Sequence, residues 1–168
     1  IISYFCKNSA SFQTSIMDNK KNITPKFGKK KDSVSDLYSG KVPPQAINLE
    51  EAVLGALMLD KDAVALIIDI LSPDSFYRDA HKHVYKAICS LFEKSHPIDL
   101  LTVTEELKSL GLLSMVGGPY QLVELTNRVA SSANIEFHAR IISQKYIQRE
   151  LIRTSTETIR TAFEDTVD

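Results

Sequence analysis

The sequence has little cysteine and no long hydrophobic run. Its 168 residues include two cysteines, Cys6 and Cys89, which lie far apart in the chain. Such a pair provides neither a disulfide framework nor a Cys/His metal cluster, and it is typical of a reducing cytosol. No apolar run reaches the roughly 20 residues that a bilayer-spanning helix needs, and no secretory signal pattern is visible. We therefore expect a cytoplasmic protein with no membrane partner.

Catalytic motifs are also absent. The sequence contains no GxxxxGK(S/T), GxGxxG, GxSxG or HExxH; Gly40-Lys41 lacks both the upstream glycine and the following Ser or Thr. His81 and His83 lie two positions apart, which on a helix places them about 200° apart, so they cannot share a metal ion. We expect His81 at the edge of the core and His83 toward solvent. The chain is expected to have no catalytic, cofactor-binding or metal site, and at 168 residues it is too short for an ATPase core plus a second domain.

The small net charge of −1 conceals two unlike parts. Residues 1–44 hold eight Lys and three Asp, whereas residues 45–168 hold 12 basic and 18 acidic side chains. Residues 1–42 therefore form a basic, low-complexity tail, and residues 17–42 are too poor in apolar side chains to fold by themselves. We expect this tail to be disordered, and we hypothesise that Met17 is the natural initiator.

The tail contains a cluster of lysines with two interpretations. The cluster could make weak electrostatic contacts to nucleic acid, or it could simply keep a flexible lead-in soluble. The second interpretation is favoured because such runs are common in disordered tails. The cluster consists of Lys26, Lys29, Lys30 and Lys31.

Helical periodicity begins near Asn48. This residue is expected to be the N-cap of the first helix, with Glu51 at the N3 position of a capping box. Gly55 lies inside this helix beside two alanines, so either another helix approaches closely there or the glycine is merely tolerated. The apolar stripe consists of Leu49, Val53, Ala56 and Leu57.

A second helix, capped by Asp62, should stop near Ser72-Pro73, where Pro73 opens a short turn. The next segment has the most regular helical spacing in the chain and should end before His96-Pro97. Its apolar positions are Ala80, Val84, Ala87, Ile88, Leu91 and Phe92.

Capping signals predict two further helices. Thr102 and Glu105 form a potential capping box, and Gly111 is placed to end that helix in a Schellman motif with Leu112 packed against Leu107. After Gly117-Gly118, a new helix is expected with Pro119 at its first position and two leucines facing inward, Leu122 and Leu125.

The last helix is expected from about Asn134 to Phe163, capped by Ser131 or Ser132. Its first half carries a core-facing stripe (Ile135, Ala139, Ile142 and Tyr146), whereas its second half is polar and rich in threonine. A helix of that composition is weak alone and needs a packing partner. Five basic residues could form either a solvated face or a partner-binding face: Arg140, Lys145, Arg149, Arg153 and Arg160.

These signals predict an all-α fold. A compact head of five or six helices should occupy residues 43–130, and residues 131–168 should form one long helix. No alternating β-branched run competes with this assignment.

Several blocks, in order and at matching spacings over about residues 40–164, resemble the N-terminal domain of DnaB-type replicative DNA helicases. They include FYRDAH (76–81), HPIDLLTVTEELK (96–108), GGPYQLVEL (117–125) and SSANIEFHARI (131–141). The resemblance implies a non-catalytic collar domain in which the long helix is the first arm of a helical hairpin. The rest of that hairpin and the ATPase motor, with its ATP and Mg²⁺, would lie beyond Asp168 in the parent protein.

The resemblance also implies partners. It predicts a homo-oligomer, a dimer for this fragment and a hexamer for the parent, that docks primase and in some systems a helicase loader, with DNA passing through the parent ring. The predicted partner and self-association face consists of Tyr146, Arg149, Arg153, Ile159, Arg160 and Phe163. The alternative is a nucleic-acid-binding helical module that acts through its Lys-rich tail.

Overall fold

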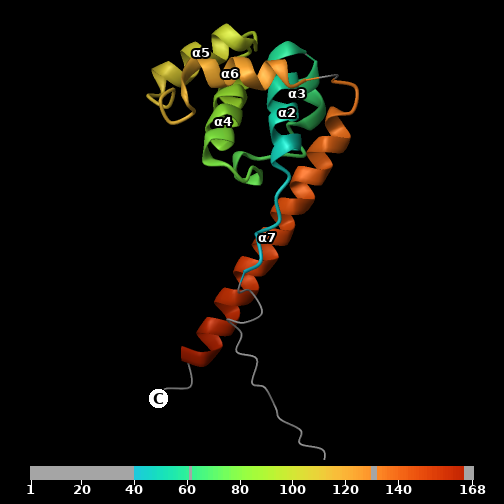
Figure 1. Cartoon of the computed structure of the whole chain (residues 1–168), viewed down its shortest axis with the longest axis vertical. Coiled ribbons are helices and arrows are strands. Elements are labelled where there is room, and N and C mark those ends of the chain that lie inside the picture. Colours follow the sequence, from blue (N-terminus) through green and yellow to red (C-terminus); the bar gives the residue numbers. More distant parts are fainter. Residues whose placement is uncertain (1–39, 61, 130–131, 165–168) are drawn as a thin grey trace, which may run out of the picture. The chain divides into compact units, whose positions relative to one another are not determined.

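The computed structural model describes residues 40–60, 62–129 and 132–164. In these residues the chain forms six α-helices, one 3₁₀ helix and no strand, which confirms the all-α fold (Figure 1). The elements are α2 (Ile47–Leu59), α3 (Ala63–Ile67), η1 (Pro73–Ser75), α4 (Asp79–Glu93), α5 (Leu100–Ser109), α6 (Gly118–Asn127) and α7 (Ile135–Glu164). The chain divides into two units, Ile1–Gly40 and Lys41–Asp168, and all of these elements belong to the second.

Two predictions lie outside the described residues: the disorder of most of the tail and the Met17 start. Within the described part, no helix is both long enough and apolar enough to cross a membrane.

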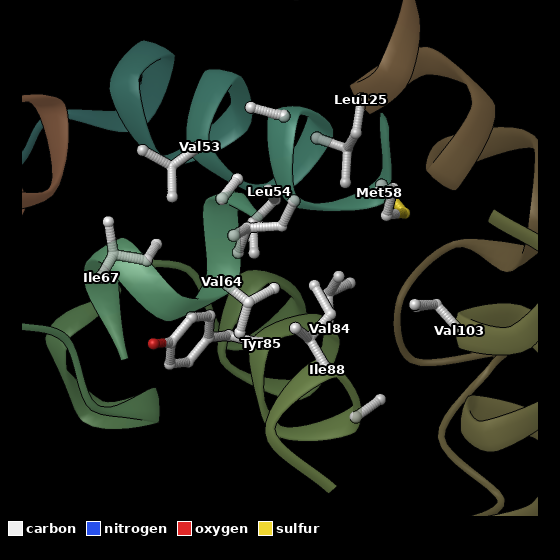
Figure 2. Packing of buried hydrophobic residues seen from close by; sticks show 14 of the residues in the cluster. Val53, Leu54, Met58, Val64, Ile67, Val84, Tyr85, Ile88, Val103 and Leu125 are labelled. Atoms are coloured by element: carbon white, nitrogen blue, oxygen red, sulfur yellow. The ribbon is translucent and has the colours of Figure 1, made fainter. Parts of the chain in front are cut away.

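Helix α2 is the centre of the head. It contacts α3, α4, α5, α6 and α7, so almost every side of it is covered. Its residues from Val53 to Met58 are all buried, which explains why apolar side chains surround this helix instead of forming one stripe. Figure 2 shows Val53, Leu54 and Met58 of α2 within the buried cluster that also includes Val64 and Val84.

Gly55 allows α6 to cross α2 at close range. A Cβ atom at this position would overlap the carbonyl oxygen of Leu125 and the Cγ2 atom of Val129, and it would lie 2.9 Å from the carbonyl carbon of Leu125. The prediction of a close helix approach at Gly55 is therefore confirmed. Glycine is needed for the space that it leaves, because it lacks a Cβ atom.

The predicted N-cap of the first helix was wrong. Ala46 holds the N-cap position without a side-chain cap bond, and its carbonyl oxygen accepts from the N–H groups of Leu49 (2.9 Å) and Glu50 (3.0 Å). Asn48 therefore lies exposed inside the first turn. Glu51 does not close a capping box because its carboxylate binds arginines from other segments, Arg78 and Arg128.

The predicted cap of α5 was also wrong. The carboxylate of Asp99 accepts from the N–H groups of Leu101 (2.8 Å) and Thr102 (2.9 Å), and the Thr102 hydroxyl accepts from the Asp99 N–H (2.9 Å). The helix begins three residues earlier than expected because an ionised carboxylate is a stronger cap acceptor than a hydroxyl. Glu105 instead pairs with Lys108 at 3.3 Å.

The Schellman ending of α5 is confirmed. Gly111 has φ +69°, its N–H bonds the carbonyl of Lys108 (3.0 Å), and the Leu112 N–H bonds the carbonyl of Leu107 (2.9 Å). Helix α6 starts one residue earlier than expected. Gly117 is its N-cap at φ +92°, and Gly118 takes the first helical position before Pro119.

The remaining elements follow the sequence with two differences. The short turn η1 and the long amphipathic α4 are confirmed, with Phe92 at the exposed edge of α4 (40% exposed). Helix α3 ends at Ile67, earlier than expected, because the chain tightens into turns in which Ile70 bonds back to the Ile67 carbonyl (2.9 Å). Asp62 occupies its N-cap position without a side-chain cap bond.

Candidate interaction surface

Helix α7 has two halves with different surroundings. It runs for 30 residues and contacts α2, α3 and η1, and its buried residues are Ile135, Ala139 and Ile142. From Leu151 to Glu164 every residue is exposed except Ile159, which is half-buried. The predicted extent of this helix and its core-facing stripe are confirmed, with Tyr146 half-buried at the end of that stripe.

The predicted serine cap of α7 is not formed by Ser132. Its hydroxyl donates instead to Oδ2 of Asp60 at 2.8 Å, and this bond is the main reason why the pKa of Asp60 lies below its usual value. The bond ties the connection before α7 to the end of α2. Ser131 lies outside the described residues.

Large apolar side chains also lie on α7 outside its buried stripe. Leu151 follows Ile142 by nine positions, which at 100° per residue places it about 180° around the helix. Exposed fractions are 54% for Ile147, 62% for Leu151 and 40% for Ile152. Ile147 lies about 40° from Leu151 around the helix, whereas Ile152 and Ile159 lie about 100° and 80° from Leu151 on the other side, on the flank of the helix. We call these four residues together the outer apolar face of α7. Exposed apolar residues that lie together are frequent at protein–protein contacts.

The arginines of α7 are largely matched by carboxylates on the same helix. Arg140 pairs with Glu136 (2.7 Å), Arg153 with Glu150 (2.8 Å) and Glu157 (3.2 Å), and Arg160 with Glu164 (3.1 Å). The hydrogen bond from Arg153 is the main reason why the pKa of Glu150 is lowered. Because the charges alternate along the helix, this arrangement favours a solvated, internally paired side over a site for a polyanion.

Arg149 behaves differently from the other arginines, because it bonds to the head. Its Nη1 donates to the carbonyl oxygen of Pro44 (2.9 Å), and its Nη2 donates to the carbonyl oxygen of Ser75 (2.7 Å). Its guanidinium carbon lies 5.7 Å from the centre of the Tyr77 ring and 5.8 Å from that of Tyr146, within the range of cation–π contacts. Nothing in the sequence pattern predicts these contacts.

A surface groove of about 550 Å³ lies beside Arg149, between η1, the start of α4 and α7. Its walls are mostly polar, and the cations among them are already engaged by carboxylates or carbonyl groups. The lining residues are Asp74, Phe76, Tyr77, Lys82, Tyr146, Arg149, Glu150 and Arg153.

Two buried carboxylates on α2 hold the surrounding segments in place. Glu50 is completely buried, and its carboxylate accepts from the Tyr77 N–H (2.8 Å) and lies 2.8 Å from Nδ1 of His81. Glu51 is 5% exposed and binds Arg78 and Arg128. Sequence reasoning missed both roles, although two consecutive glutamates in an otherwise apolar helix are a usable signal, because a buried charge needs partners.

The histidine pair is separated as its spacing predicts. His81 is buried against Glu50, whereas His83 is half-buried on another side of α4. Among the described residues, no group of three or more His, Cys, Asp or Glu side chains is arranged to hold a metal ion.

The predicted partner residues lie in two environments. Tyr146 and Arg149 are half-buried at the junction with the head, whereas Arg153, Arg160 and Phe163 are exposed and Ile159 is half-buried in the second half of α7. The lysine cluster of the tail (Lys26, Lys29, Lys30 and Lys31) lies outside the described residues.

Comparison with known proteins gives consistent results. Residues 42–144 match the family model of the DnaB-like helicase N terminal domain. The chain is 45% identical over 130 residues to the replicative DNA helicase DnaB of Rhodothermus marinus, covering 77% of this chain and 14% of that protein. It is also 45% identical over 123 residues to the replicative DNA helicase DnaC of Bacillus subtilis, covering 73% of this chain and 27% of that protein. The chain thus spans less than a third of either relative.

Solved structures share the fold. The crystal structure of the N-terminal domain of DnaB helicase from Mycobacterium tuberculosis superposes with a TM-score of 0.72 at 37% identity, covering 74% of this chain and 89% of that one. A structure of a DnaB-like replicative helicase, described together with its interactions with primase, superposes with a TM-score of 0.62 at 23% identity, covering 69% of this chain and 27% of that one.

Proposed function

The chain belongs to the family of DnaB-like helicase N-terminal domains, and from this membership we propose that it is part of the non-catalytic collar of a hexameric replicative DNA helicase. In this role the domain joins subunits and docks other replication proteins. The parent protein would unwind duplex DNA with ATP and Mg²⁺ bound in a separate motor domain, at the replication fork in a bacterial cytoplasm.

The observation that carries the proposal is the outer apolar face of α7. Ile147, Leu151 and Ile152 are all exposed in the single chain. Burying each of these side chains against a partner would stabilise the complex by about 1.5–3 kcal/mol. The head does not bury this face, because the buried residues of α7 are Ile135, Ala139 and Ile142. We therefore assign the outer apolar face to contacts with other helices, including those of a second copy of the chain.

Primase is the docking partner that we propose, with a helicase loader as a further partner in some systems. Support comes from family membership and from the solved DnaB-like helicase described with its primase interactions. DNA would contact the parent ring, and the carboxylate-paired arginines of α7 do not offer a separate nucleic-acid surface.

The six residues predicted for the partner face divide between two tasks in this proposal. Arg153, Ile159, Arg160 and Phe163 belong to the surface that meets partners. Tyr146 and Arg149 support that surface, because their contacts hold α7 on the head.

A charge placed on the outer apolar face should prevent self-association. We expect the weight-average mass of the wild-type chain to rise with concentration into the high micromolar range, as measured by sedimentation equilibrium. Leu151→Asp should weaken this association at least about tenfold, because it replaces a contact worth more than about 1.4 kcal/mol by a carboxylate that must be desolvated.

Ala65→Asp is the matched control, because it adds the same charge to an exposed position of α3. This control should associate like the wild-type chain. A wild-type chain that stays monomeric at these concentrations, or a Leu151→Asp chain that associates as strongly as the control, would refute the assigned role of this face.

A further inference from the structure

We propose that Arg149 is a latch that sets the direction in which α7 leaves the head and couples this direction to the segment that leads into α2. This segment comprises residues 41–46 and is called the lead-in below. The inference depends on the proposed function only for its effect on assembly, because the latch itself can be measured in a monomer.

Arg149 lies at the boundary between the packed and exposed halves of α7. It follows the buried Ile142 by seven positions, which is two helical turns, so it faces the head from the same side of the helix. Beyond it, from Leu151 to Glu164, no residue is buried. Because Arg149 is, within the described residues, the last residue of α7 hydrogen-bonded to the head, its contacts set the direction of the exposed half of the helix relative to the head.

The guanidinium group joins three segments. Arg149 itself belongs to α7, its Nη1 bonds the Pro44 carbonyl in the lead-in, and its Nη2 bonds the Ser75 carbonyl at the end of η1. Stacking between the rings of Tyr77 and Tyr146 restricts the rotation of the group. A lysine carries the same charge, but it lacks the planar pair of donors and the flat face that these contacts require.

The lead-in is the more weakly held of the two bonded segments. It has no regular secondary structure, whereas η1 is fixed by its own capping box, in which the side chains of Ser72 and Ser75 both bond the backbone. The side-chain oxygen of Gln45, next to Pro44, is buried and makes no hydrogen bond within the described residues. A buried acceptor without a partner costs free energy, so this part of the lead-in is the easier one to release.

Release of the lead-in would change the position of the exposed half of α7. Phe163 lies 14 residues beyond Arg149, about 21 Å at 1.5 Å per residue, so each 10° change in direction moves it by about 4 Å. The coupling is reciprocal, because a partner that fixes the direction of α7 must also change how tightly the lead-in is held. The lead-in and the exposed half of α7 are thus two linked sites.

Distances between spin labels test the latch. The labels are attached through Lys86→Cys on α4 and Thr158→Cys on α7, both exposed, in the 168-residue chain whose Cys6 and Cys89 are alanine. Leu151→Asp is included in every sample so that monomers are compared. In addition, hydrogen exchange measured by mass spectrometry reports on the peptide that covers the lead-in and the first turn of α2.

Arg149→Lys should at least double the width of the distance distribution and raise hydrogen exchange in the lead-in peptide at least tenfold. Arg153→Lys is the control, because within the described residues Arg153 bonds glutamates of its own helix, and it should change neither quantity. Tyr146→Leu keeps both hydrogen bonds of Arg149 and removes one ring, so it should cause a smaller change in the same direction.

Two results would overturn the latch. One is a wild-type distance distribution and wild-type exchange in both Arg149→Lys and Tyr146→Leu. The other is equal broadening in Arg153→Lys, since α7 would then be loose without any specific contribution from Arg149. Neither result depends on self-association, so both can be told apart from a failure of the proposed function.

Discussion

Gly55→Ala is expected to lower the free energy of unfolding by about 3 kcal/mol, or to prevent folding altogether. The added methyl group meets the backbone of Leu125 and the side chain of Val129, and a backbone carbonyl on a packed helix cannot move aside cheaply. Overpacking of a core typically costs about 1–3 kcal/mol and more when backbone must shift. For a folded part of this size the melting temperature should fall by roughly 10 °C.

The sign of this effect separates two explanations of Gly55. In a helix where glycine is merely tolerated, alanine would stabilise the protein by up to about 1 kcal/mol. Asn48→Ala is the matched control, because Asn48 is exposed on the same helix and its N-cap position is held by Ala46; it should change stability by less than about 0.5 kcal/mol. Urea unfolding of the wild-type, Gly55→Ala and Asn48→Ala chains measures the free energy of unfolding of each. A Gly55→Ala chain as stable as the wild type would contradict the close crossing of α2 and α6.

The second large effect is expected from Glu50→Ala, which should destabilise the domain by about 3–5 kcal/mol. Removing a buried carboxylate leaves its partners without an acceptor, and breaking a buried pair from one side typically costs this much. The groups left behind are the Tyr77 N–H and the His81 ring, both 2.8 Å from the Glu50 oxygens. These contacts connect α2 to the start of α4 and to the turn before it.

Two further substitutions make this test specific. Glu50→Gln keeps one oxygen acceptor of nearly the same shape, so it should be less destabilising than alanine. Glu105→Ala removes an exposed glutamate that pairs only within α5, and it should be nearly neutral. Thermal and urea unfolding measure all three, and a loss of less than about 1 kcal/mol in Glu50→Ala would show that this carboxylate does not hold the head together.

The order and type of the helices could be predicted because they depend on local patterns. Apolar spacing fixed the core faces of α4 and α7, while Pro73, Gly111 and Gly117 marked breaks between elements. The exact starts of α2 and α5 could not be predicted. Helix α2 begins after Ala46, which has no capping side chain, and two capping residues, Asp99 and Thr102, compete at the start of α5. Asp99 forms the cap of α5, although Thr102 fits the same motif three residues later.

The long-range polar contacts could not be predicted from the chain alone. The two carbonyl groups that bind Arg149 come from residues 105 and 74 positions away, and a main-chain carbonyl leaves no trace in the side-chain pattern. Glu51 similarly binds Arg128, 77 positions away. The exposed second half of α7 was predictable, because its composition lacks a sufficient apolar stripe for the core.

Calorimetric titration of the full chain with the helicase-interacting domain of a primase from the same organism tests the central claim most directly. A collar domain should give saturable heat of binding with a defined stoichiometry. The chain must be folded and at a concentration where it self-associates, so that the surface formed by paired domains is present. No detectable binding at high micromolar concentrations of both proteins would contradict the assignment of this domain as a docking site for primase.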